Sequence, residues 1–314
     1  MSVQVAAFYG FTAMAALPEL QAELRALAEA GSVRGTILLA EEGVNGTISG
    51  PEPGVQTVLA RLRKLPGLSG LEAKFSEAPD EAFHRLKVRI KREIVTMGCP
   101  TVKPAEQVGT YVPPQQWDAL ISDPDTLVVD TRNAYEVAVG SFTGAIDPGT
   151  ESFREFPGWV ERELRPLVEQ RQPKAIAMFC TGGIRCEKST AYLLQQGFTN
   201  VHHLQGGILR YLEEMPEQDS SWQGECFVFD QRVSVNHQLE PGSYSLCHAC
   251  GLPLSPADRE HPAYRQGVSC PHCITRFSDA DRARFAERQR QMQLARERGQ
   301  QHIGAQVAAG SAGG

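Results

Sequence analysis

Apolar positions along the first hundred residues predict short strands and helices in alternation. Leu20 and Leu24 recur at helical spacing, and Asn45-Gly46 marks the tight turn of a β-hairpin. The resulting order, βαββαβ, is that of a ferredoxin-like α+β domain with the split βαβ pattern, which we place at residues 1–98. Its elements are expected at 2–9, from 17 onward, and at 35–40, 47–50, 54–65 and 83–90.

After a Pro-containing connector at 99–122, apolar strands alternate with amphipathic helices. Residues 126–130, 175–179 and 200–204 are expected to form strands. This alternation predicts an α/β domain with a parallel sheet at 123–217. Open sheets of this kind bind ligands at the carboxyl ends of their strands, so the residues after 179 are the first candidates for a site.

The candidate site is the loop that runs from Cys180 to Arg185. Glycines free to take positive φ, followed by a helix start, gather backbone N–H groups into a nest that holds an anion. In this nest we expect Cys180 to be a catalytic thiolate of low pKa, with Arg185 as a fixed positive charge beside it. The alternative is a βα turn in which Cys180 is only a small buried residue. The anion cradle is expected to comprise Thr181, Gly182, Gly183 and Ile184.

Cys186 follows in the first turn of the next expected helix. Two interpretations are open for it. Cys186 is either a packing residue or the thiol that resolves an oxidised Cys180.

The expected strand at 83–90 is apolar on one face and basic on the other, because side chains alternate between the two faces of a strand. Such a basic row is either a solvated outer face or a track for a phosphate backbone. Its cations are Arg85, Lys87, Arg89 and Lys91.

Two Cys-x2-Cys pairs lie in a Cys-rich region at 218–275. This arrangement of four thiolates is typical of a structural zinc ribbon, whereas the alternative is a set of reduced surface thiols. His248 and His272 lie inside the pairs as substitute ligands, but sulfur is preferred. The expected zinc ligands are Cys247, Cys250, Cys270 and Cys273.

An arginine-rich helix and a tail are expected at 276–314. The helix, which includes Arg284 and Arg288, has only a thin apolar stripe and is either solvated or an arm along RNA phosphates. The Gly/Ala-rich stretch Ala305–Gly314 is expected to be disordered.

Composition and charge narrow the functional classes. The 314 residues suffice for two or three domains, and the formal net charge of −6 argues against a surface that is basic throughout. No run approaches the ~18–20 apolar residues of a membrane span, and the N-terminus lacks the cationic start of a signal peptide. We therefore expect a cytoplasmic protein without a membrane segment. In that reducing compartment, eight cysteines suggest catalysis or metal binding before disulfides.

Several motifs resemble known families. Between residues 123 and 217 the chain resembles the rhodanese domain, whose loop cysteine carries a persulfide, at Asp130-x-Arg132, Glu136, Gly144-Ala145, the Cys180 loop and Leu204-x-Gly206-Gly207. Over nearly the whole chain, three longer motifs resemble the rhodanese-containing tRNA uridine hydroxylase (TrhO) family. They are Glu42–Thr47, Cys180–Lys188 and Gly224–Asp230.

The second resemblance implies a tRNA-modifying oxidoreductase that forms 5-hydroxyuridine at the wobble position, with molecular oxygen as co-substrate. Two versions of the chemistry are open: the Cys180 thiolate adds to uracil C6, or an oxidised or persulfidated Cys180 delivers the reactive group. A persulfide sulfurtransferase with the same cysteine, acting on cyanide, thiols or a tRNA thiolation pathway, is the alternative activity. A non-catalytic RNA-binding or redox-sensing protein is a third hypothesis. Phosphatase activity is disfavoured, because the Cys-x4-Arg loop is shorter than the Cys-x5-Arg loop that surrounds a phosphate.

Overall fold

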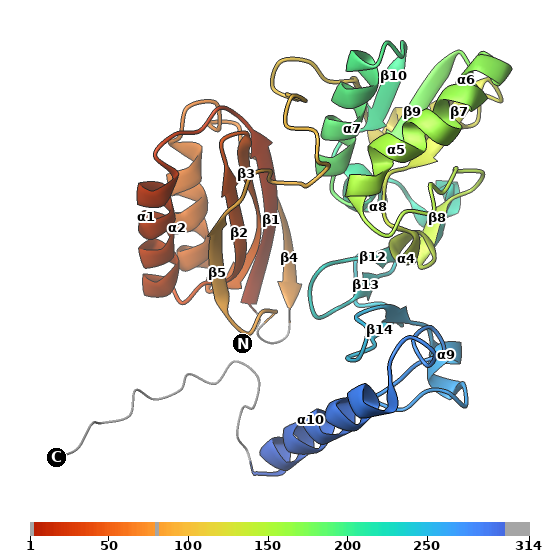
Figure 1. The fold of residues 1–314 in the computed structure, drawn as a ribbon. Coiled ribbons are helices and arrows are strands. Elements are labelled where there is room, and N and C mark those ends of the chain that lie inside the picture. Colours follow the sequence, from red (N-terminus) through yellow and green to blue (C-terminus); the bar gives the residue numbers. More distant parts are fainter. Residues whose placement is uncertain (1–2, 79–81, 299–314) are drawn as a thin grey trace. The chain divides into compact units, whose positions relative to one another are not determined.

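The computed structural model describes residues 3–78 and 82–298 of the chain (Figure 1). The chain divides into two compact units, Met1–Gly242 and Ser243–Gly314. The stretch Ala305–Gly314, expected to be disordered, lies outside the described residues. Among those that are described, no helix is both long enough and apolar enough to span a bilayer.

The N-terminal part of the first unit is a five-stranded sheet with two helices against one face (Figure 1). The helices are amphipathic, and their buried residues, such as Leu24 and Leu59, form one core with Ile37 and Ile48 of the sheet. The strands lie in the order β4-β1-β3-β2-β5. The elements are β1 (Val3–Phe11), α1 (Leu17–Ala30), β2 (Arg34–Ala40), β3 (Gly43–Gly50), α2 (Glu52–Arg63), β4 (Ala73–Ala78) and β5 (Leu86–Ile90).

The ferredoxin-like fold class is confirmed, but the strand that closes it was assigned wrongly from the sequence. The closing strand is β4, which pairs antiparallel with β1. The predicted strand at 83–90 is instead β5, an added edge strand parallel to β2. Residues 73–78, AKFSEA, are mostly weak strand formers, so pairing with β1 and not intrinsic propensity determines their structure.

A rhodanese-like α/β domain follows, built on a parallel sheet with strand order β6-β10-β9-β7. The stretch 99–122, expected to be a connector, contributes β6 and α3 to this domain, and the other predicted domain boundaries stay predictions. The strands are β6 (Thr110–Val112), β7 (Thr126–Asp130), β8 (Gly140–Phe142), β9 (Ala175–Phe179), β10 (Val201–Leu204), β11 (Trp222–Gly224), β12 (Cys226–Phe227) and β13 (Ser234–Val235). The α-helices are α3 (Pro114–Ile121), α4 (Ala134–Val137), α5 (Phe156–Trp159), α6 (Arg165–Arg171), α7 (Ile184–Gln195) and α8 (Gly207–Glu214). The short helical segments η1 (Phe153–Glu155) and η2 (Val160–Leu164) lie between α4 and α6, and η3 (Glu217–Asp219) follows α8.

All five residues of β9 are buried, because cores cover both faces of the sheet. Ile176 and Met178 pack into one core, whereas Ala177 and Phe179 pack into the other. The same alternation turns the next residue, Cys180, toward the core of Met178. The buried strand therefore sets the direction in which the loop cysteine points.

The second unit, described from Ser243 to residue 298, contains β14 (Ser245–Leu246), β15 (Pro253–Leu254), α9 (Pro256–Glu260) and α10 (Asp279–Glu297). Its apolar core is small, and three of its four buried members are cysteines: Cys247, Cys270 and Cys273, together with Leu254.

Candidate functional site

The loop after β9 holds the Cys180 sulfur in a closed cradle. Cys180 is 1% exposed, and the N–H of Gly183 donates to its Sγ at 3.1 Å. Gly183 can turn its N–H inward because its φ is 103°, a value that favours glycine. At the start of α8, the N–H groups of Ile208 and Leu209 donate to the carbonyls of Cys180 at 3.0 Å and Thr181 at 3.1 Å. The bond from Gly183 and the two bonds from α8 together fix the conformation of the loop.

The surroundings of Cys180 favour its thiolate. Burial raises the pKa of the Cys180 thiol, but a hydrogen bond from Cys186, the charge of Arg185 and the N–H groups of Cys186 and Gly183 outweigh burial and lower the pKa to about 6. The thiolate is the nucleophilic form of cysteine and predominates above that pH.

Arg185 is oriented by a buried carboxylate. Its two terminal nitrogens each donate to Glu136 at 2.8 Å, in a bidentate pair that fixes the plane of the guanidinium. Glu136 is held in turn by α4, where the N–H of Asn133 donates to its Oε2 at 3.1 Å in a capping box. Thr181 also donates to Glu136, from Oγ1 at 3.5 Å. Glu136 therefore positions Arg185 and ties it to the cradle.

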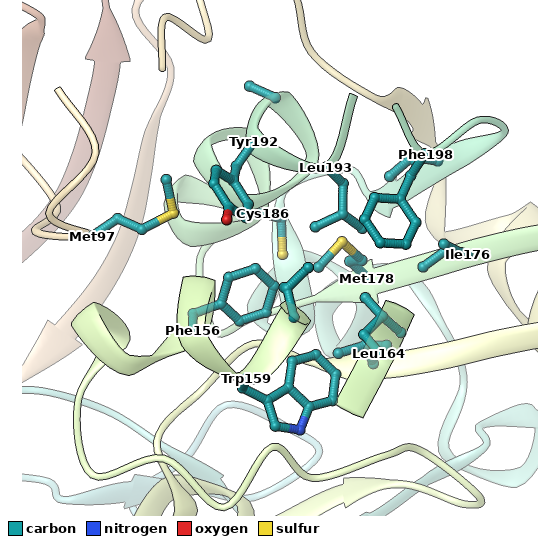
Figure 2. Packing of buried hydrophobic residues seen from close by; sticks show 14 of the residues in the cluster. Met97, Phe156, Trp159, Leu164, Ile176, Met178, Cys186, Tyr192, Leu193 and Phe198 are labelled. Atoms are coloured by element: carbon teal, nitrogen blue, oxygen red, sulfur yellow. The ribbon is translucent and has the colours of Figure 1, made fainter. Parts of the chain in front are cut away.

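Cys186 is fully buried and lies among the side chains of Phe156, Met178, Tyr192 and Leu193 (Figure 2). Burial, then the hydrogen bond to Cys180 and its negative charge, raise the pKa of Cys186 well above the ordinary value. Cys186 is therefore a protonated thiol that donates to the Cys180 sulfur, within an apolar core.

Lys74 reaches the Cys180 loop from strand β4 of the N-terminal sheet. Its Nζ donates to the carbonyl of Gly182 at 3.1 Å and also to that of Gly206. Burial lowers the pKa of Lys74 to about 8, although the nearby Cys180 and Cys226 oppose this fall. The ammonium group therefore lies at the rim of the cradle.

Tyr9 of β1 covers the other side of the loop. Its hydroxyl donates to Glu187 Oε1 at 2.8 Å. A Cβ at Gly183 would lie 2.6 Å from the same hydroxyl, so the absence of a side chain there permits this approach. Together, Tyr9 and Lys74 make the Cys180 site a composite of two domains.

A buried ionic cluster joins the same two domains. Lys188 of α7, which has no exposed side-chain surface, donates from Nζ to Glu42 and to Glu93, at 2.7 Å in each case. Glu42 Oε1 also accepts from the N–H of Ile94 at 2.7 Å. Two motifs of the family resemblance, around Glu42 and around Lys188, thus meet in one ion cluster.

Several of these residues have no role that could be assigned from the sequence. Lys74 was missed because β4 was missed. Glu136 and Glu187 belong to motifs of the family resemblance but have no role assigned there, and nothing in the local pattern points to Tyr9. The only sequence signal for these contacts is that both domains contain motifs of the same family resemblance.

In the second unit, four cysteine sulfurs form the cluster that the Cys-x2-Cys pairs predict. All four lie within 4.8 Å of one another. The Cys247–Cys273, Cys250–Cys270 and Cys270–Cys273 sulfur pairs are 4.0, 3.8 and 3.5 Å apart. Zinc–sulfur bonds of about 2.3 Å in a tetrahedron require sulfurs about 3.8 Å apart, so this donor set fits zinc.

The predicted basic residues do not gather around Cys180. Arg85, Arg89 and Lys91 are exposed and Lys87 is half-buried, but β5 lies at the opposite edge of the sheet from β4, which supplies Lys74. In α10, Arg284 pairs with Asp281, and Arg288 donates to the carbonyl of His248. Part of the donor capacity of these two arginines is therefore used within the second unit.

Two family descriptions match the chain. The UPF0176 acylphosphatase like domain covers residues 3–94, and the Rhodanese-like domain covers residues 113–214. These matches agree with the two sheets of the first unit.

Three relatives that align with more than nine tenths of this chain bear the name tRNA uridine(34) hydroxylase. A relative from Synechococcus sp. (strain CC9605) is 61% identical over 92% of this chain and 90% of its own length. Relatives from Jannaschia sp. (strain CCS1) and Mesorhizobium japonicum are 57% and 54% identical, each over 96% of this chain and over 98% and 97% of their own lengths.

Proposed function

Since this chain belongs to the tRNA uridine(34) hydroxylase family, we propose that it hydroxylates the uridine at position 34 of tRNA to 5-hydroxyuridine in the cytoplasm, with molecular oxygen as co-substrate. The observation that carries the proposal is the buried Cys180 thiolate in its cradle beside Arg185. A wobble base lies in an unpaired loop, so moving it out of its stack into such a site costs little.

In this proposal Cys180 is the nucleophile and Arg185 helps to keep it anionic. The sulfur forms a bond to uracil C6, and the C5=C6 electron pair moves onto C5 and O4, which makes C5 electron-rich toward an oxygen species. C5 then forms a bond to one oxygen of a peroxide, which molecular oxygen and a two-electron cellular reductant supply; the O–O bond breaks and the second oxygen leaves as hydroxide. Loss of the C5 proton and departure of the thiolate from C6 then restore the C5=C6 double bond. In the other version, an oxidised or persulfidated Cys180 delivers the reactive group to the base.

Cys186 is proposed as the resolving thiol. If Cys180 is oxidised to a sulfenic acid, the Cys186 sulfur forms a disulfide with it and water leaves, after which a cellular thiol reduces the disulfide. The hydrogen bond from the Cys186 thiol to the Cys180 sulfur supports this role. The alternative is a packing role, supported by the apolar neighbours of Cys186 (Figure 2).

Sulfur transfer is not favoured. It uses the same Cys180, but the similar full-length proteins are named as hydroxylases.

We propose a structural zinc ion held by Cys247, Cys250, Cys270 and Cys273, which fit it in number and spacing. Bound there, zinc would stabilise the second unit, whose buried apolar core is very small.

We also propose that tRNA phosphates contact the basic row of β5, with Arg284 and Arg288 of α10 as further contacts. The exposure of Arg85, Arg89 and Lys91 supports the first set. The second set has weaker support, because α10 interleaves its arginines with Asp281, Glu287 and other acids.

Mass spectrometry of tRNA nucleosides tests the proposed function. Cells that lack this protein should lose 5-hydroxyuridine, the wild-type gene should restore it, and Cys180→Ser should not. A parallel hydroxylation pathway must be deleted in the same strain. Unchanged 5-hydroxyuridine in that strain, or full restoration by Cys180→Ser, would contradict the proposal.

A further inference from the structure

One motif of the family resemblance, Gly224–Asp230, has no role in the chemistry described above. Within it, Phe229 is 59% exposed, the largest exposed fraction among the large hydrophobic side chains found exposed in the described part of the chain. Its ring lies against the catalytic loop, with the Arg185 guanidinium carbon 5.8 Å from the ring centroid. Single exposed apolar side chains are common on protein surfaces, so the contact of Phe229 with Arg185, and not its exposure alone, distinguishes it from the others.

The turn between β12 and β13 presents Phe229 in a fixed way. The N–H of Val228 donates to the carbonyl of Val233 at 2.9 Å and closes the turn. Asp230, next to Phe229, pairs with Arg232 through hydrogen bonds to both carboxylate oxygens. The Phe229 side chain is thus held at the tip of a short, well-bonded turn.

Two neighbours orient the Phe229 ring. Phe227, which is 5% exposed, packs against it with ring centroids 5.1 Å apart and an interplanar angle of 85°. Phe227 is itself packed edge-on against Tyr135, at 5.4 Å. With Arg185 also in contact, the ring is anchored while more than half of the residue's surface stays open to solvent. An anchored aromatic ring with an open face, next to a cation, is the kind of surface on which single-stranded RNA bases stack.

We propose that Phe229 is a stacking platform for an unpaired base of the anticodon loop that neighbours the target uridine. This inference rests on the proposed function. The target uracil must reach Cys180, which is 1% exposed, whereas Phe229 is 59% exposed and contacts the Arg185 that flanks this cysteine. Phe229 has no polar atom to read a base edge, so the platform selects an unpaired, splayed loop and not a particular neighbouring base.

A shielding role for Phe229 predicts different behaviour. If the ring only kept water from Arg185, its removal would weaken the Arg185 charge effect and raise the pKa of Cys180, without a specific effect on RNA. A stacking platform predicts weaker RNA binding at an unchanged pH dependence of Cys180 alkylation. The two roles are therefore separated by two measurements on the same variant.

The first test measures the affinity of the full-length protein for an anticodon stem-loop RNA by fluorescence anisotropy. Phe229→Ala should weaken binding by about 5- to 150-fold, the usual effect of removing one base–aromatic stack. Phe229→Trp should retain binding, and Phe229→Leu should not. The matched control is Phe75→Ala, because Phe75 is also exposed, at 46%, but alternates along β4 with Lys74 and so faces away from the loop.

The second test identifies the stacked base. Stem-loops with an abasic site at position 33 or at position 35 should bind more weakly to the wild type, and at one of these positions the loss should disappear in Phe229→Ala. Equal affinities of wild type and Phe229→Ala, or additive losses at both positions, would overturn the stacking role. Failure of the proposed hydroxylase function gives a different result: the wild-type protein would form no 5-hydroxyuridine, whatever the RNA affinity of Phe229→Ala.

Discussion

The Cys180 sulfur is almost inaccessible, and the same burial makes its neighbours effective. In a water-poor site, the charge of Arg185 and the donors Gly183 and Cys186 act with little screening. Arg185 is paired with Glu136, so the pair as a whole carries little net charge. The electrostatic effect of the pair on the Cys180 sulfur therefore depends on the orientation of Arg185 and Glu136, which the bidentate contact fixes.

The pH dependence of alkylation follows from this arrangement. Iodoacetamide should modify Cys180 with a midpoint near pH 6, because the thiolate reacts and its pKa is lowered to about 6. Arg185→Met removes a charge that favours the thiolate, so the midpoint should move up, toward the ordinary value of about 8.5. Peptide mass spectrometry after timed labelling measures the midpoint. The same midpoint in both proteins would show that Arg185 does not activate the thiol.

At the scale of the elements, the packing of α8 on the loop should be sensitive to one glycine. Gly207 has a φ of +67°, and a Cβ there would lie 2.4 Å from the Cys180 carbonyl oxygen and 2.8 Å from the Gly183 nitrogen. Gly207→Ala should therefore displace the loop from the Cys180 sulfur, weaken the N–H contacts that favour the thiolate and move the pH midpoint of Cys180 alkylation upward by about one unit, since a backbone contact that short cannot relax cheaply. The pH dependence of the alkylation rate measures this shift independently of how exposed the sulfur becomes.

Gly197→Ala is the matched control for that substitution. Gly197 has a φ of +84°, but a Cβ there meets no atom within 4 Å. It should carry the same left-handed backbone cost, about 1–2 kcal/mol, and leave Cys180 reactivity unchanged. Equal effects of the two substitutions would mean that the clash with the loop is unimportant.

The local pattern was informative where an element is determined by its own residues. The buried run of β9 and the Gly-Gly turn before α7 located Cys180, Arg185 and the cradle. Strand β4 was not predictable, because its pairing with β1 is a long-range contact and its own residues have weak strand propensity. The partners that converge from far along the chain, Lys74 and Tyr9, were missed because they too depend on long-range contacts, and Glu136 was recognised only as part of a motif, without its contact to Arg185.

The ionic cluster between the domains should contribute strongly to stability. Lys188→Met would leave Glu42 and Glu93 close together without their cation. Removal of one partner from a buried ion pair typically costs about 3–5 kcal/mol, so unfolding should begin at a clearly lower temperature or denaturant concentration. Calorimetry or denaturant titration measures the change. As a surface comparison, Lys103→Met removes an exposed pair with Glu106 and should change stability by less than about 1 kcal/mol.

At the scale of the whole molecule, the stability of the second unit should depend on the proposed zinc ion. Protein purified without chelator should contain about one zinc per chain by elemental analysis, because four thiolates define one tetrahedral site. Cys250→Ser should lower the zinc content, and a strong chelator should make residues 243–298 more susceptible to protease. Cys99→Ser, outside the cluster, is the control. If the untreated protein does not contain a stoichiometric amount of metal, the proposed zinc site is contradicted.

The salt dependence of tRNA binding should show which basic surface contacts the phosphates. If β5 binds phosphates, the double variant Arg85→Gln/Arg89→Gln should weaken binding and flatten the dependence of log affinity on log salt by about 0.7–0.9 for each phosphate that is no longer neutralised. The corresponding Arg284→Gln/Arg288→Gln variant tests α10. Unchanged salt slopes in the first variant would assign the row on β5 to a solvated face.

The buried contacts of Lys188 with Glu42 and Glu93, and of Lys74 and Tyr9 with the Cys180 loop, limit how this protein can be dissected. A fragment restricted to the rhodanese-like residues would retain Cys180. In that fragment, however, Lys188 would be exposed without its two carboxylate partners, and the Cys180 loop would lose its contacts with the N-terminal sheet. Loop grafts and domain exchanges between homologues should accordingly succeed only when both halves are transferred together. The pair of domains is then the functional unit, and neither domain keeps the complete site when it is transferred alone.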